Sequence, residues 1–116
     1  MKLKENEVIW GDALDILGTI AENTADMIYL DPPFCTQEKQ RMVSSKNSKE
    51  YIFDDTWKDM DDYLYYMKKR LVQCRRVLKE TGSIFVHCDR NASHYLKVLM
   101  DKIFGISNFQ SEIIWS

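Results

Sequence analysis

A carboxylate, two prolines and an aromatic ring follow one another at Asp31-Pro32-Pro33-Phe34. The prolines fix two successive φ angles and bias Asp31 towards an extended backbone, so this turn is stiff. Neither proline has an N–H, which leaves hydrogen-bond acceptors, the Asp31 carboxylate and nearby carbonyl oxygens, beside the Phe34 ring. Such a turn suits a planar substrate with an amino group, which stacks on Phe34 and donates to Asp31 and the Pro32 carbonyl. The alternative is a strand-ending turn whose aspartate only caps a local N–H.

The residues before this turn predict the strand that positions it. The run Met27-Ile28-Tyr29-Leu30 is nearly all apolar. A short run of this kind is typical of a strand that is buried on both faces of a parallel sheet. Asp31 therefore follows the carboxyl end of a strand, which is the edge where open α/β sheets bind ligands.

A second acidic residue, Asp12, also follows the carboxyl end of a predicted strand, the one that precedes Met27–Leu30 in the chain. Glu7–Trp10 is a short strand candidate that ends at Gly11. Asp12 can then cap a helix, and capping is the more common role of an aspartate at this point. A cap and a ligand contact can coexist, because the start of the helix faces the same edge of the sheet. The apolar residues of this helix recur at helical spacing: Leu14, Leu17, Ile20 and Ala21.

The remaining residues predict a long loop, two helices and two further strands. Residues 35–59 are polar and lack periodicity, which fits either a functional loop or a surface excursion. Asp59 is expected to cap a helix that ends at Gly82, with one apolar stripe along its length. The stripe residues are Met60, Leu64, Met67, Leu71, Cys74 and Leu78. Two further strands are expected, at Ser83–Cys88 and at Glu112–Trp115. The helix between them is expected to be capped by Asn91 or Ser93 and closed by Gly105. Its inward residues are Tyr95, Leu96, Leu99, Met100 and Ile103.

Composition limits the class of protein. The 116 residues are 45% hydrophobic and carry a formal net charge of -2, which fits one small domain or part of a larger one. This charge argues against a domain that grips nucleic acid by bulk electrostatics, and it leaves a local basic patch open. No apolar run is long enough to span a bilayer, and the charged start is unlike a signal peptide.

The cysteines and histidines predict no metal site. Cys35, Cys74 and Cys88 are odd in number and widely spaced, which fits free thiols in a reducing cytoplasm. His87 and His94 have no partner at the spacing of metal ligands or of a catalytic triad. We therefore interpret both histidines as structural.

Four segments carry a resemblance to a known family: Asp31–Phe34, Tyr51–Trp57, Gly82–Asp89 and Glu112–Trp115. In this order they resemble the catalytic half of the amino-methylating DNA methyltransferases. More narrowly, they resemble the adenine-N6 enzymes of the permuted subclass, whose catalytic motifs precede the cofactor-binding motif. The resemblance implies an α/β, partial Rossmann-like methyltransferase fold with a mostly parallel sheet flanked by helices. The initial Asp, where the cytosine-N4 enzymes more often have Ser, favours adenine.

By that resemblance, the reaction is transfer of a methyl group from S-adenosylmethionine to N6 of an adenine flipped out of duplex DNA. Asp31 and Pro32 would accept the hydrogen bonds of the amine, with Pro33 fixing the turn and Phe34 stacking on the base. Asp12, in a Gly-Asp pair that resembles the family's cofactor-side acidic motif, would approach the cofactor, as would Asp31. Because Phe34 separates the next residue, a cysteine, from the prolines, no covalent intermediate of the cytosine-C5 type is expected.

The resemblance also indicates what these residues lack. The family binds the methionine part of the cofactor with a Gly-rich loop and reads DNA with a separate region, whereas Gly11, Gly18, Gly82 and Gly105 are scattered. Residues 1–116 are therefore expected to be the catalytic N-terminal portion of a methyltransferase domain, inactive alone. Its expected partners are a C-terminal half or complementary subunit and, as a further option, a restriction subunit. An RNA-directed enzyme, a cytosine-N4 enzyme and a catalytically silent remnant stay open as alternatives.

Overall fold

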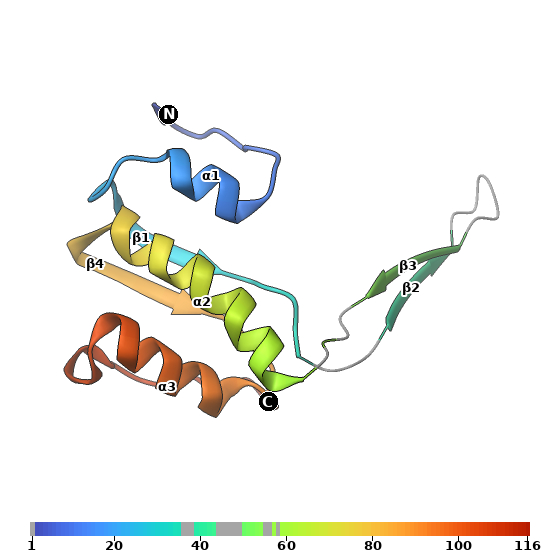
Figure 1. Ribbon diagram of the computed structural model, residues 1–116. Coiled ribbons are helices and arrows are strands. Elements are labelled where there is room, and N and C mark those ends of the chain that lie inside the picture. The colour runs from blue at the N-terminus through green and yellow to red at the C-terminus, as the bar shows by residue number, and fades with distance from the viewer. Residues whose placement is uncertain (1, 36–38, 44–49, 55–56, 58) are drawn as a thin grey trace.

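Two parallel strands and three helices form the body of the protein. The computed structural model describes residues 2–35, 39–43, 50–54, 57 and 59–116. Strands β1 (Ala25–Leu30) and β4 (Leu78–Val86) pair in parallel. Helix α2 (Met60–Val77) lies along them, between α1 (Ala13–Thr19) and α3 (Ser93–Phe104), as Figure 1 shows. A short 3-10 helix, η1 (Ile106–Asn108), follows α3. The predicted α/β class, a partial Rossmann-like fold, is confirmed.

Side chains alternate between the two faces of the β1–β4 sheet. Ile28 and Leu30 of β1 are half-buried on one face, and Leu30 packs against the helical core, as the alternation of a strand requires. On the opposite face Met27 is 62% exposed, Tyr29 59% and Phe85 44%. The prediction that Met27–Leu30 is buried on both faces is therefore wrong, because the described helices cover only one face.

The apolar stripe of α2 forms the centre of the core. Met67, Leu71 and Cys74 are buried as predicted, and Tyr63 is buried with them. On α3, Leu96 and Ile103 are buried. Tyr95 is 55% exposed, so its predicted inward position is wrong.

Helix α2 begins as predicted and ends earlier. The Asp59 carboxylate accepts a hydrogen bond from the Asp62 N–H at 2.8 Å, which is an N-cap. The helix ends at Val77, because the N–H groups of Asn23 and Thr24 bind the carbonyl oxygens of Arg76 and Val77 at 3.0 and 2.7 Å. The predicted end at Gly82 is wrong: this glycine lies inside β4.

The predicted cap of α3 is also wrong. The helix starts after Ala92, and no side chain caps it. Ser93 is already helical and its hydroxyl donates to the Arg90 carbonyl at 3.4 Å, while the Asn91 amide donates to the Cys35 carbonyl at 3.5 Å. Gly105 closes the helix as predicted, with a φ of 96° that favours glycine.

The segments Glu7–Trp10 and Glu112–Trp115 form no strand, contrary to prediction. A strand requires a neighbour to satisfy its N–H and C=O groups, and neither segment is paired with another strand in the described part of the chain. Trp10 and Trp115 are nearly fully exposed, at 99% and 96%.

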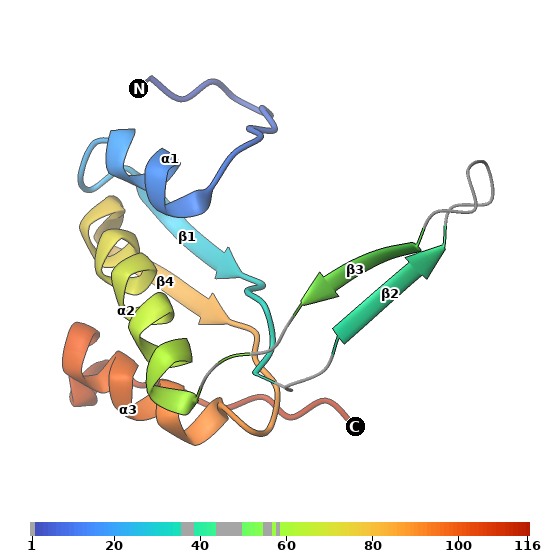
Figure 2. The same cartoon turned by 45° about the vertical axis from the view of Figure 1, so that its right-hand side comes forward.

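A β-hairpin occupies part of the segment that was expected to be a loop. Strands β2 (Lys39–Val43) and β3 (Glu50–Asp54) pair antiparallel in a separate sheet. Figure 2 shows the hairpin extending away from the helices, on the side where β1 ends. Antiparallel pairing satisfies the backbone of both strands locally, so the expectation of an unstructured loop throughout 35–59 is wrong. The basic residues Lys46 and Lys49 lie outside the described residues.

Gly82 is expected to be intolerant of any side chain. A Cβ there would lie 2.6 Å from Leu78 Cδ1 and 3.0 Å from the backbone oxygen of Asp26. Gly82→Ala should therefore lower the Tm of the chain, measured by circular dichroism. Gly18→Ala is the matched control, because nothing lies within 4 Å of that Cβ. In helix α1 this change should stabilise by about 0.5–1 kcal/mol. An unchanged Tm for Gly82→Ala would contradict the packing of β4 against β1.

Candidate active site

The turn after β1 has an exposed carboxylate at one end and a buried thiol at the other. Asp31 directly follows the last residue of β1, and its side chain is 70% exposed. Pro32 and Phe34 are half-buried, and Cys35 is 4% exposed within the core. The turn is therefore anchored at its second end and presents its acid to solvent at the first.

Residues that follow β4 hold the buried end of this turn. One Asp89 oxygen accepts from the Cys35 N–H at 3.3 Å, and the other accepts from the Asn91 N–H at the same distance. The Asn91 amide donates to the Cys35 carbonyl at 3.5 Å. From another direction, the Trp57 indole N–H donates to the Phe34 carbonyl at 3.4 Å. We call Asp89 and Asn91 the turn latch, since both bind the backbone next to Phe34.

His87 lies beside the exposed end of the same turn. Because Leu30 pairs with Val86, the residues that follow these two, Asp31 and His87, lie side by side. His87 Nδ1 is 3.8 Å from Asp31 Oδ1, and the centres of the His87 and Phe34 rings are 5.3 Å apart. His87 is thus a neighbour of both the Asp31 carboxylate and the Phe34 ring, the two groups that the sequence predicts for the site.

Asp12 caps α1 as predicted and binds an arginine as well. Its Oδ1 accepts from the Leu14 N–H at 2.8 Å, and its Oδ2 lies 3.3 Å from Arg70 Nη2. The hydrogen bond from Leu14 holds the pKa of Asp12 below its ordinary value, and Arg70 acts in the same direction. The carboxylate is therefore ionised at neutral pH. The start of α1 lies towards the side to which the arrow of β1 points (Figures 1 and 2), so Asp12 belongs to the same side of the fold as the turn.

The thiols near the turn are unsuited to nucleophilic attack. All three cysteines are free. Burial, and secondarily the Asp89 carboxylate, raises the pKa of Cys35 and of Cys88, and burial raises the pKa of Cys74 to about 11. Because the thiolate is the reactive form, this agrees with the expectation that Cys35 does not attack a substrate.

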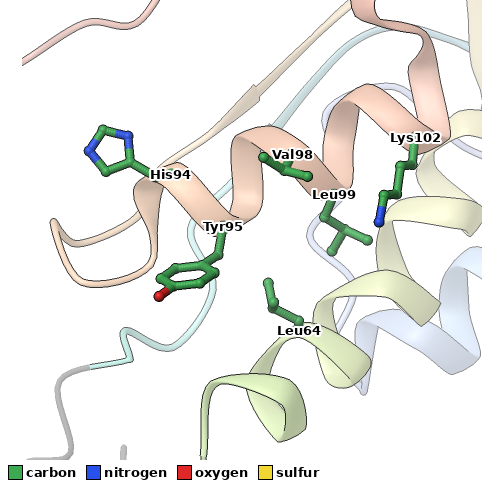
Figure 3. A pocket seen from close by; sticks show the side chains of 6 residues that line it. All are labelled: Leu64, His94, Tyr95, Val98, Leu99 and Lys102. Atoms are coloured by element: carbon green, nitrogen blue, oxygen red, sulfur yellow. The ribbon is translucent and has the colours of Figure 1, made fainter.

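A shallow hollow lies elsewhere, between α2 and α3 (Figure 3). Its lining residues are Leu64, His94, Tyr95, Val98, Leu99 and Lys102. None of them is part of the turn or of the latch. Within the described ranges, no group of three or more His, Cys, Asp or Glu side chains could hold a metal ion, and no helix is long and apolar enough to cross a membrane.

The structure thus brings Asp31, Pro32, Pro33 and Phe34 together with residues that the sequence did not single out for the site. From the sequence, His87 is interpreted as structural, Asp89 is named only as the last residue of the segment Gly82–Asp89, and Asn91 is named only as a candidate cap. The signal that could have found His87 is the register of two parallel strands: if both end at the same edge, the residues after them meet there. Asp12 has no contact with Asp31 among the described interactions.

The structure thus has an α/β fold with hydrogen-bond acceptors and an aromatic ring at the carboxyl edge of its parallel strands. Residues 25–116 match the DNA methylase family of the N6/N4 type. The chain belongs to this family.

Curated relatives agree with the family. The chain is 37% identical over 107 residues to the type II methyltransferase M.EcaI of Enterobacter cloacae, covering 90% of this chain and 22% of that protein. It is 33% identical over 134 residues to the StyLTI Mod subunit, a type III restriction-modification protein of Salmonella typhimurium, covering 98% and 21%. It is 29% identical over 109 residues to the DNA adenine methyltransferase YhdJ of Escherichia coli, covering 94% and 32%. The chain thus spans about a fifth to a third of the length of these relatives.

The turn latch makes a prediction about Cys35. Alkylation of this thiol by iodoacetamide at pH 8 should be slow, because its pKa is raised and its side chain is buried. Asp89→Ala removes the carboxylate that accepts from the Cys35 N–H, a bond that contributes about 1.5–3 kcal/mol, so Cys35 labelling should rise at least about tenfold. Mass spectrometry of the labelled peptides separates the three cysteines.

Asp26→Ala is the control for the latch. This carboxylate is 82% exposed and pairs with Lys79 at 2.9 Å, so its loss should leave Cys35 labelling unchanged. Cys74, a fully buried residue of α2, is an internal reference in the same sample. Equal labelling of Cys35 in the two variants would mean that Asp89 does not hold the turn.

Proposed function

We propose that residues 1–116 act as the catalytic portion of a DNA adenine-N6 methyltransferase. The observation that carries the proposal is the turn after β1, whose exposed Asp31 carboxylate and half-buried Phe34 ring both lie beside His87. An acid alone would fit many enzymes. Acceptors beside an aromatic face fit a base that has an exocyclic amine. The choice of adenine rests on Asp31 as the first residue of the motif and is supported by the name of one relative, a DNA adenine methyltransferase.

In this proposal Asp31 and Pro32 orient the amine of the flipped base. The nitrogen of an exocyclic amine is a weak nucleophile, because its lone pair is delocalised into the ring. Asp31 and the Pro32 carbonyl accept the two N–H groups, which directs the lone pair towards the methyl donor. Phe34 stacks on the base, and Pro33 keeps the ring and the carboxylate at a fixed separation.

The acceptors of the chain fit the amino groups of S-adenosylmethionine. When bound, this cofactor supplies an electrophilic methyl group on a sulfonium. Asp12 is 52% exposed and ionised, and a carboxylate that already accepts from Leu14 and Arg70 keeps further lone-pair sites. Asp12 would therefore hold the cofactor's adenine amine, with Asp31 on the side of the reacting methyl group.

The partners proposed are duplex DNA and a complementary cofactor-binding half. Met27, Tyr29 and Phe85 are exposed together on the uncovered face of the sheet, and exposed apolar patches often mark interaction sites. We propose that further strands and helices of the same methyltransferase fold cover it. A restriction subunit is a further candidate partner, since one relative is a Mod subunit of a type III restriction-modification enzyme. The free cysteine thiols fit a location of the protein in the reducing cytoplasm.

The test is complementation. A type II methyltransferase relative can be produced without the 107 residues that this chain matches and co-expressed with the chain; we call the product the complemented enzyme. Transfer of tritiated methyl groups to adenine in duplex DNA is the expected result. Methyl transfer to ribosomal RNA alone, or to cytosine, would show that adenine in duplex DNA is not the substrate. A stable complex without any methyl transfer would indicate that the chain is a catalytically silent remnant.

Asp31→Ala should lower methyl transfer by the complemented enzyme at least about a hundredfold, because a positioned electrostatic group is lost. Cofactor affinity, measured by calorimetry, should change little. Asp61→Ala is a suitable control, since that acid lies in the first turn of α2. Near-normal turnover of Asp31→Ala would exclude the role given to this carboxylate.

Phe34→Ala should weaken retention of the flipped base by roughly 1–3 kcal/mol, the usual contribution of a base stacked on an aromatic ring. Fluorescence of 2-aminopurine at the target position reports the flipped base. Phe34→Tyr keeps an aromatic face and should behave like the unmodified chain. Equal fluorescence for Phe34→Ala and Phe34→Tyr would count against stacking.

A further inference from the structure

The imidazole of His87 contacts three residues around the candidate site. Its Nδ1 is 3.2 Å from the Tyr29 hydroxyl and 3.8 Å from Asp31 Oδ1. Its ring lies 5.3 Å from that of Phe34, centre to centre, at an interplanar angle of 48°. Its backbone N–H donates to the Leu30 carbonyl at 2.9 Å, which fixes the start of the side chain.

These contacts do little for the core. The His87 side chain is 51% exposed and Tyr29 is 59% exposed on the bare face of the sheet. A half-exposed polar pair contributes little to stability compared with a buried apolar side chain. The contacts are instead aimed at the two groups that the proposed reaction uses, Asp31 and Phe34.

The neighbours of Nδ1 favour a proton on that nitrogen. Asp31 is an acceptor when ionised, and the Tyr29 oxygen can accept or donate. With the proton on Nδ1, the ring can donate to either oxygen, whereas an unprotonated Nδ1 would face the carboxylate with a lone pair. The distance to Asp31 is too long for a hydrogen bond. Such contacts in an enzyme without substrate often shorten when the substrate is bound.

We propose that His87 is a positioning residue for Asp31 and Phe34, a role that rests on the proposed function. Its Nδ1–H holds one oxygen of Asp31, which leaves the other oxygen for the amine of the base. Its ring supports one side of the Phe34 ring. The Tyr29 hydroxyl, 3.2 Å from the same nitrogen, shares this proton and limits rotation of the imidazole, so a residue of β1 and the residue that follows β4 orient the acid between them.

The first test observes the ring in the chain itself by ¹⁵N NMR. Asp31→Asn and Tyr29→Phe should each change the Nδ1 resonance of His87. His94, the other histidine, lines the hollow between α2 and α3 and is the matched control, so its resonances should stay in place. Unchanged His87 resonances in both variants would overturn the proposed geometry.

The second test is a double-mutant cycle for methyl transfer in the complemented enzyme. His87→Phe keeps a ring against Phe34 and loses the donor, so kcat should fall about 10- to 100-fold, as a misplaced catalytic group commonly causes. His87→Asn places an amide N–H near the former Nδ1 and should restore part of kcat. KM for the cofactor and the Tm should stay the same in both variants, which separates positioning from a structural role.

Combination with Asp31→Ala decides whether His87 acts through Asp31. In that background His87→Phe should cost less than about twofold in kcat, because residues that act through one another are not additive. Full additivity in an active enzyme would overturn the role of His87 and leave the proposed function standing. An unmodified complemented enzyme that transfers no methyl group would overturn the proposed function and, with it, this role.

Discussion

The parallel pairing of β1 with β4 is the constraint on which the rest of the structure depends. It brings Leu30 next to Val86, and the residues after each strand meet at one edge. Without this register, Asp31 would face solvent with no neighbour. With it, His87 lies beside Asp31 at one end of the turn and Asp89 binds Cys35 at the other, although both are more than fifty residues away in sequence. One strand pair thus supplies both the position of the acid and the contacts that orient it.

The same pair explains why one face of the sheet is bare. Two strands can bury one row of side chains under α2, and the alternation of a strand places the other row on the opposite face. Tyr29 belongs to that second row, yet its hydroxyl reaches His87. A partner that packs on this face, as proposed for the cofactor-binding half, would therefore contact the residue that holds the imidazole. Assembly and orientation of Asp31 would be physically coupled through Tyr29.

Local signals in the sequence predicted much of the fold, and contacts between distant residues set the rest. The Asp12 and Asp59 caps and the stripe of α2 depend on residues within one or two turns, and these predictions are confirmed. The end of α2 depends on Asn23 and Thr24, more than fifty residues earlier. The prediction that Gly82 ends this helix was wrong for that reason. For the candidate site, the acidic turn is predicted from its residue types. His87 and the turn latch are not, because their partners come from another strand.

Helix α2 supports both acids of the candidate site from one rigid element. Arg70 at its centre stacks on Tyr66, with its guanidinium carbon 3.5 Å from the ring centre, and its side chain is only 13% exposed. It therefore holds Asp12 from a fixed position. About two helical turns earlier, Tyr63 packs in the same core cluster as Cys35, the buried end of the turn. Groups held by packed side chains on helices are more precisely placed than groups held by loops. Helix α2, whose apolar stripe forms the core, thus also holds Asp12 through Arg70 and packs against the buried end of the turn that begins at Asp31.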